Sequence, residues 1–457
     1  MFVLRVALFA AAAFAAGIAT QLPARAETLE DALVMAYRSN PTLMAKRAEL
    51  RAVDEGVAQA RSGFRPTIIG DGNVGHTESE TESATGGNNS ESYNPRSVSL
   101  SAVQPLYTGG RTPAEIRSAE DLVQAGRADL QVTEQRVILD AVTAYLDVLQ
   151  NEAEVELNEN NVRVLGEQLE AARNRFEVGD VTKTDVAQAE ARLAQAQSDS
   201  VAAEGNLIQS RSAYREVIGS VPGTLVWPEP ALRIPESEEA AHALAAEANP
   251  SIILADYLER SARNQIDVAS SALWPKVQLR GQLSQAYEQS SFFEEESAAT
   301  IRAEVSVPLY QSGSEYASIR RNKQIAGQRR LELDAARRSV SDEVTQAWEA
   351  LATARARGVA LTAQIEAARA ALDGVQQEVD VGLRTTLDVL DAEQELFTAQ
   401  VNRVRARRDE YVAGYQLKST VGELTAELLA LPVERYDETE YYDKVRDKWI
   451  GTEINGE

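Results

Sequence analysis

An internal repeat constrains the fold of this 457-residue chain more than any other feature. The segment Phe64–Ile68 recurs 209 residues later as Leu273–Val277. The segment Gln104–Gly110 recurs as Val307–Gly313, but here the offset has fallen to 203 residues, and it keeps this value as far as Gly219. Self-similarity at a long, nearly fixed interval indicates a duplicated structural unit. The chain is therefore predicted to contain two copies of one unit in tandem.

The change in the offset locates the variable part of that unit. It falls between Pro66 and Pro105, an interval that contains residues 78–94, which are rich in Gly, Ser, Asn and Glu. Loops accept insertions more readily than packed elements do, so we expect 78–94 to be an exposed polar loop. The predicted organisation is a signal peptide (1–26), a first repeat (27–219), a linker (220–247), a second repeat (248–429) and a C-terminal tail (430–457).

A heptad pattern dominates the second half of each copy. In the second copy, apolar or small residues follow one another at alternating spacings of four and three, a period of 3.5 residues that is typical of coiled coils. They are Val340, Val344, Ala347, Leu351, Ala354, Gly358, Leu361, Ile365, Ala368, Leu372, Val375 and Val379. The same register recurs 203 residues earlier, interrupted by Asn151 and Asn158. We predict a helix over about residues 113–178, roughly 100 Å long at about 1.5 Å per residue.

Each long helix is expected to turn back on itself. Gly179 and Gly382 follow the two heptad segments, where a helix commonly ends in a left-handed residue. The motifs Thr182-x-x-Asp185 and Thr385-x-x-Asp388 come next and have the spacing of a capping box. Each copy is therefore predicted to form one antiparallel helical hairpin with a tight tip.

Alternating segments precede each hairpin. Apolar and polar residues alternate over Thr300–Leu309, Val277–Ser284 and Val98–Leu106, whereas the segment around Thr67–Gly75 alternates poorly. Such segments fit membrane strands of about ten residues, although a soluble hairpin packed on the helices has the same period. Open strand edges are not tolerated in hydrocarbon, and closed membrane barrels need about eight strands or more. Several chains would then have to build one barrel.

Four prolines flank these segments. They are Pro66, Pro105, Pro275 and Pro308. Proline is tolerated at the ends of helices and strands and disrupts their interiors. We therefore expect them to mark the junctions between the strands and the helices.

The N-terminus and the composition narrow the class of protein. Residues 1–26 combine Arg5, an apolar stretch over 6–19 and an Ala24-Arg25-Ala26 cleavage site, as secretory signal peptides do. No run of 18 apolar residues follows, so no transmembrane helix is expected. The net charge of −24 argues against nucleic acid as a partner.

The sequence offers no catalytic or metal-binding pattern. It contains no cysteine, which excludes disulfides and thiolate zinc sites. His76 and His242 have no neighbouring residues that suggest a metal site or a catalytic triad. We expect no enzyme activity, no metal and no cofactor.

Two motifs within this duplicated frame resemble the TolC family of outer-membrane efflux proteins. They are Gln104–Arg111, which leads into the first long helix, and Val381–Asp391 at the second tip. Over nearly the whole mature chain, the resemblance implies a homotrimer with one twelve-stranded β-barrel in the lipid of the outer membrane, continued by an α-helical barrel in the periplasm of a Gram-negative bacterium. It also implies a periplasmic membrane-fusion adaptor and an inner-membrane transporter as partners, and a duct that performs no chemistry.

The resemblance further implies a gate at the periplasmic tips. By motif match, Asp388 and Asp391 would narrow the entrance, and Arg384 would form a polar latch with Thr184 and Asp185. Each residue also has a plainer interpretation, since Asp388 and Asp185 suit helix caps and Arg384 suits a solvated surface. The matching position of a family tip tyrosine is Val379, so one link is missing or replaced.

A different function remains open from the residues alone. A periplasmic adaptor or scaffold also uses a coiled-coil hairpin to bridge two membranes without forming a pore. Two hairpins and two pairs of alternating segments in one chain favour the export duct. An exported hydrolase has no nucleophile and base in its favour.

Overall fold

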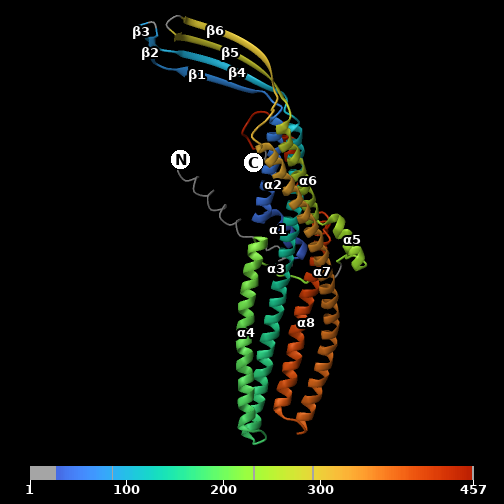
Figure 1. Ribbon diagram of the computed structural model, residues 1–457. Helices are drawn as coiled ribbons and strands as arrows, with labels where there is room; N and C mark the ends of the chain where they lie inside the picture. Colours follow the sequence, from blue (N-terminus) through green and yellow to red (C-terminus); the bar gives the residue numbers. More distant parts are fainter. Residues whose placement is uncertain (1–26, 85, 230–231, 291–292, 455–457) are drawn as a thin grey trace, which may run out of the picture. The chain divides into compact units, whose positions relative to one another are not determined.

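The computed structural model describes residues 27–454 apart from 85, 230–231 and 291–292 (Figure 1). The predicted signal peptide, residues 1–26, lies outside the described residues. The chain divides into two compact units, and each unit combines parts of both repeats. The strand-bearing unit comprises Met44–Thr133, Ala246–Asp342 and Tyr436–Glu457, and the hairpin unit comprises Met1–Leu43, Glu134–Ala245 and Glu343–Arg435.

The strand-bearing unit contains one four-stranded antiparallel sheet in the order β1-β4-β5-β6. Its strands are β1 (Thr67–Val74), β4 (Arg96–Tyr107), β5 (Lys276–Ser290) and β6 (Phe293–Ser306). The first two strands come from one repeat and the last two from the other, and β4 pairs with β5 in a register that sets Leu100 opposite Leu283. Duplicated hairpins are therefore joined edge to edge into one sheet.

One face of this sheet is apolar and exposed. The register places Ile68, Leu100, Leu283, Ile301 and Val305 on the same face, since residues two apart on a strand share a face and paired residues lie side by side. All five side chains are exposed. The other face carries Arg280, Arg302 and Glu304, so the alternation predicted from the sequence is confirmed.

Three details of the predicted strands are wrong. Residues 78–94 are largely exposed but include most of two paired strands, β2 (Thr77–Ser83) and β3 (Gly87–Tyr93). In β2, Glu alternates with Thr and Ser, a polar pattern with a period of two. Strand β6 ends at Ser306, so Val307–Leu309 lies outside it. Pro105 lies inside β4 and not at its end, next to a register shift between Pro105 and Tyr107 that accommodates the missing amide donor.

The remaining prolines lie between elements. Pro66 and Pro275 immediately precede β1 and β5, and Pro308 follows the end of β6. Helix α2 (Pro41–Ser62) precedes β1, and helix α6 (Pro250–Ser270) with η1 (Ser271–Leu273) precedes β5. Helix α9 (Glu440–Val445) lies in the C-terminal tail.

Two helical hairpins account for nearly half of the chain. They are α3 (Arg111–Glu177) with α4 (Lys183–Ile218), and α7 (Ser314–Asp380) with α8 (Thr386–Thr420). Helices α3 and α7 have 67 residues each, so the duplication has preserved their length. Eight of the heptad positions predicted in the second copy are buried hydrophobic residues, among them Val344 and Leu351. Burial of this seam removes apolar surface from water and holds each hairpin together.

The N-terminal helix and the linker pack on the hairpin unit. They include α1 (Leu29–Ser39) and α5 (Glu238–Ala248). The buried Tyr145 hydroxyl of α3 lies 2.6 Å from the Val226 carbonyl oxygen and accepts a hydrogen bond from the Val226 amide at 3.1 Å. Trp227 lies beneath the Arg407 guanidinium of α8, with 4.3 Å between guanidinium carbon and ring centre. No helix among the described residues is long and apolar enough to cross a membrane.

Candidate functional site

The tips of the two hairpins are built on glycine. Gly179 and Gly382 have φ angles of 86° and 78°, which a residue with a side chain adopts only with strain. At the first tip the Gly179 amide donates to the Phe176 carbonyl at 3.0 Å and the Asp180 amide to the Arg175 carbonyl at 2.9 Å. The same pair of bonds recurs at Gly382 and Leu383. These bonds close the carbonyl ends of α3 and α7 and reverse the chain, as the sequence predicts.

Both returning helices begin with a capping box. An Asp185 oxygen accepts from the Thr182 amide at 2.8 Å, and an Asp388 oxygen accepts from the Thr385 amide at 2.8 Å. The Thr hydroxyls satisfy the Asp amides in return. The hydrogen bonds from Thr385 and the neighbouring Arg384 charge hold the pKa of Asp388 below its usual range. The capping role that the spacing indicated for these two aspartates is confirmed.

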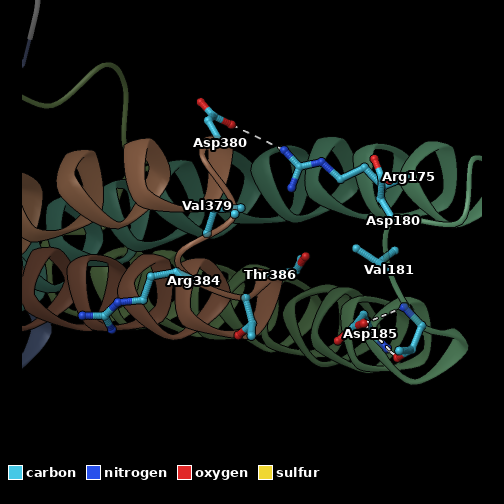
Figure 2. Close-up of a pocket in the computed structure, with 11 residues that line it drawn as sticks. Arg175, Asp180, Val181, Asp185, Val379, Asp380, Arg384 and Thr386 are labelled. Atoms are coloured by element: carbon cyan, nitrogen blue, oxygen red, sulfur yellow. Dashed lines mark hydrogen bonds and ion pairs between the residues drawn. The ribbon is translucent and has the colours of Figure 1, made fainter.

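A polar cleft lies between the tips of the two hairpins, with a volume of about 500 Å³ (Figure 2). Its lining residues are Arg175, Asp180, Val181, Thr182 and Asp185 of the first hairpin and Val379, Asp380, Gly382, Arg384, Thr385 and Thr386 of the second. The structure thus brings the predicted latch residues Arg384 and Asp185 to one cleft. The predicted residues Thr184, Asp388 and Asp391 are not among its lining residues.

Arg384 forms its ion pairs within its own hairpin. Its Nε donates to Glu378 Oε2 at 2.9 Å, and its Nη1 lies 3.6 Å from Asp388 Oδ1. Thr184 is exposed at the first turn of α4. Within one chain, Arg384 therefore braces the second tip and supports the cap at Asp388.

Two ion pairs that sequence reasoning missed link one hairpin to the other. Arg192 Nη2 of α4 donates to Asp391 Oδ1 of α8 at 2.8 Å, and Arg175 Nη2 of α3 lies 3.4 Å from Asp380 Oδ1 of α7 (Figure 2 shows the second pair). Asp391, predicted to narrow the entrance, thus has a basic partner on the neighbouring hairpin.

A comparison of the two repeats shows a sequence difference that singles out the two arginines of these pairs. The positions equivalent to Arg192 and Arg175 in the second copy are Glu395 and Glu378, so the charge is reversed between the copies. These two arginines therefore belong to the first tip alone, and the sequence marks the two tips as unlike in charge.

The same two hairpins are also joined above the tips by a buried charge. Glu154 of α3 is 5% exposed and accepts from Arg405 Nε and Nη2 of α8 at 2.8 and 3.0 Å. Beside it, Arg408 Nε donates to Asp147 Oδ1 at 2.8 Å. An apolar cluster around Leu165 and Leu169 of α3 includes Leu390 of α8. The described hairpins are therefore held by buried contacts near Glu154 and by exposed ion pairs at their tips.

Removal of the Arg405 side chain should test the buried link. Arg405→Ala leaves the Glu154 carboxylate buried with only Gln150 as a side-chain donor, and we expect a loss of about 2–3 kcal/mol in the free energy of unfolding. Urea denaturation followed by helical circular dichroism measures this loss. The double variant Glu154→Gln with Arg405→Ala should recover much of it, because no charge is then buried. Arg163→Ala, which removes an exposed pair within α3, is the control and should cost less than about 0.5 kcal/mol.

Comparisons with known proteins agree on the family. The model of the outer membrane efflux protein family matches residues 32–220 and residues 242–423 of this chain. The chain is 37% identical over 448 residues to the outer membrane efflux protein BepC of Brucella suis, with 97% of this chain and 96% of that protein covered. It is 29% identical to the outer membrane protein TolC of Vibrio cholerae, over 88% of this chain and 92% of that protein.

A solved structure shows the same fold. The Campylobacter jejuni CmeC outer membrane channel superposes with a TM-score of 0.78 at 15% sequence identity, over 92% of this chain and 89% of that one. The two matched family segments and the relative aligned over almost its full length cover most of the chain. The chain belongs to the outer membrane efflux protein family, and it is an outer-membrane channel that reaches into the periplasm of a Gram-negative cell and conducts exported substrates.

Proposed function

We propose that three copies of this chain form one twelve-stranded β-barrel continued by a helical tunnel, and that the assembly is a passive duct without enzyme activity. The observation that carries this proposal is the four-stranded sheet with an exposed apolar face. In the described chain, β1 and β6 each have a neighbouring strand on one side only. Open edges of this kind cannot lie in hydrocarbon, so β6 of one copy pairs with β1 of the next.

The tips form the periplasmic gate in this proposal. Asp388 and Asp391 of the three copies narrow the entrance and favour cations, while Arg384 latches the second tip to Thr184 and Asp185 of a neighbouring hairpin. The cleft shared by Arg384 and Asp185 supports the latch. The link through Arg192 gives Asp391 a second role, because its carboxylate also ties α8 to α4.

The duct receives its cargo from a complex in this proposal. A periplasmic membrane-fusion adaptor and an inner-membrane transporter dock at the periplasmic end, and the transporter supplies the energy. The exported substrates are drugs, other small molecules or secreted proteins. The efflux function in the name of the Brucella suis relative supports the export of such substrates.

Ion conductance in a planar bilayer tests the proposed function. The purified protein should give small, cation-preferring currents, and these should grow when Asp388 and Asp391, or Arg384, are changed to Ala. Glu167→Ala is a matched control, because Glu167 is an exposed acid on the first hairpin that pairs with Arg163 of its own helix. An adaptor or scaffold without a pore would give no current in any variant, and that result would overturn the proposal.

A further inference from the structure

The end of the C-terminal tail is fixed next to the point where the strands begin. Asp447 forms an ion pair with Arg61 in the last turn of α2, and Arg65 Nη1 donates to the Lys448 carbonyl oxygen at 2.7 Å. Arg65 lies two residues before β1. All of these residues belong to the strand-bearing unit.

The tail exposes large apolar side chains next to the start of β1. Trp449, Ile450 and Ile454 are 66%, 89% and 67% exposed. The Trp449 ring is oriented by the Arg65 guanidinium, whose central carbon lies 4.8 Å from the ring centre. A segment fixed by an ion pair, a backbone hydrogen bond and a cation–π contact, yet with its apolar side chains uncovered, has the form of a docking surface.

The neighbouring chain ends of the sheet add to the same surface. Phe64 and Trp274 are also exposed, and they precede β1 and β5 by two or three residues. Strands β1 and β5 run in the same direction because both are antiparallel to β4, so these aromatic residues lie at the same end of the sheet.

The aromatic and apolar character of the tail, and not its charge, favours the interface of a lipid bilayer. Lys444 is paired with Glu440, and Arg446 is paired with Asp443 and Asp447 of the same tail. Tryptophan prefers the interface between headgroups and acyl chains, which is where a side chain fixed next to the first residue of a membrane strand would lie.

We propose that Trp449, Ile450 and Ile454 form an interfacial anchor that enters the periplasmic leaflet of the outer membrane at the foot of the strands. The proposal rests on the proposed function, in which these strands cross that membrane. The anchor sets the depth of the sheet in the bilayer, since the tail is fixed to Arg61 and Arg65 on the chain that leads into β1.

Fluorescence quenching by brominated lipid tests the anchor. The triple variant Trp227→Phe, Trp274→Phe and Trp348→Phe leaves Trp449 as the one tryptophan. It is reconstituted in vesicles of phosphatidylethanolamine and phosphatidylglycerol whose acyl chains carry bromine near the headgroup. Interfacial side chains enter about 5–10 Å into this region, so we expect emission about twofold lower than in unbrominated vesicles. The matched control keeps Trp348, on α7 in the hairpin unit, as the one tryptophan, and should not be quenched.

Conductance of the same single-tryptophan protein separates the two proposals. Conductance together with quenching of Trp449 supports the anchor. Conductance without quenching shows that the strands are inserted and overturns the anchor alone, and blue-shifted but unquenched emission would identify a protein contact in place of lipid. Loss of both conductance and quenching in a protein that keeps its helical circular dichroism would overturn the proposed function, and the anchor with it.

Discussion

The double variant Arg175→Ala with Arg192→Ala is expected to raise the equilibrium constant for opening of the duct by about two orders of magnitude. It removes both ion pairs that link the tips of the two hairpins, Arg175–Asp380 and Arg192–Asp391. Each of these half-exposed pairs should contribute about 0.5 kcal/mol, and three copies of two pairs give about 3 kcal/mol in the closed-to-open equilibrium. Single-channel recording in a planar bilayer measures the open fraction and the conductance.

A charge exchange distinguishes the loss of a link from the loss of a charge. Asp391→Arg alone places two cations face to face across α4 and α8 and should open the tip. Arg192→Asp in the same chain restores the pair with its sign reversed and should close it again. If the exchanged pair stays open, Asp391 acts through its own negative charge at the entrance and not through Arg192.

The first hairpin offers a matched control for this experiment. Arg173 Nη2 lies 2.6 Å from Glu190 Oε1, so this pair joins α3 to α4 and does not link one hairpin to the other. Arg173→Ala removes an arginine of similar exposure two residues from Arg175. It should leave the open fraction unchanged, and an equal increase would mean that any loss of positive charge opens the tip.

Replacement of a buried carboxyl in the strand-bearing unit should stabilise the protein above neutral pH. Asp54 of α2 is fully buried, and neither of its carboxyl oxygens has a hydrogen-bond partner among the described residues. Burial raises the pKa of Asp54 from 3.8 to about 6; Arg127 opposes this increase, whereas Glu55 and Glu438 add to it. The ionised form is therefore unfavourable in the folded protein.

The pH dependence follows from this difference. The folded protein holds its proton up to about pH 6, whereas the unfolded chain releases it near pH 4, so the carboxyl costs stability progressively as pH rises between these values. The full difference corresponds to about 3 kcal/mol. Asp54→Asn removes the charge but keeps a buried amide, so we expect a gain of about 1–2 kcal/mol at pH 8 and none at pH 4.

Thermal denaturation of the purified protein over this pH range measures the effect. Glu49→Gln is the control, because Glu49 is an exposed carboxylate of the same helix that pairs with Lys46 at 2.9 Å. It should change the stability by less than about 0.5 kcal/mol at any pH. A loss of stability in Asp54→Asn at pH 8 would show that the ionised carboxylate is the stabilising form.

Periodicity in the chain predicted most of the fold. The heptad of the second copy, from Val340 to Val379, is matched by a helix that ends at Asp380, and Gly382 turns as expected. The alternation of apolar and polar residues around Ile301 and Val305 also corresponds to a strand, β6. The hairpin within 78–94 was missed because its exposed strands bury no apolar face, and a polar strand has little to distinguish it from a loop.

Secondary structure is determined largely by residues that are close in the sequence. The sequence therefore predicts the lengths of the helices, their caps at Asp185 and Asp388, and their turns. The partners of charged side chains are set differently. Asp391 meets Arg192, and Arg405 meets Glu154, across helices whose residues lie about 200 to 250 positions apart in the chain. Such pairs depend on how one hairpin packs on the other. The periodicity of a single helix does not determine which of its charged residues faces the other hairpin. The packed structure therefore adds the ion pairs between the hairpins, the cleft shared by Arg384 and Asp185, and the position of Trp449 at the foot of the sheet.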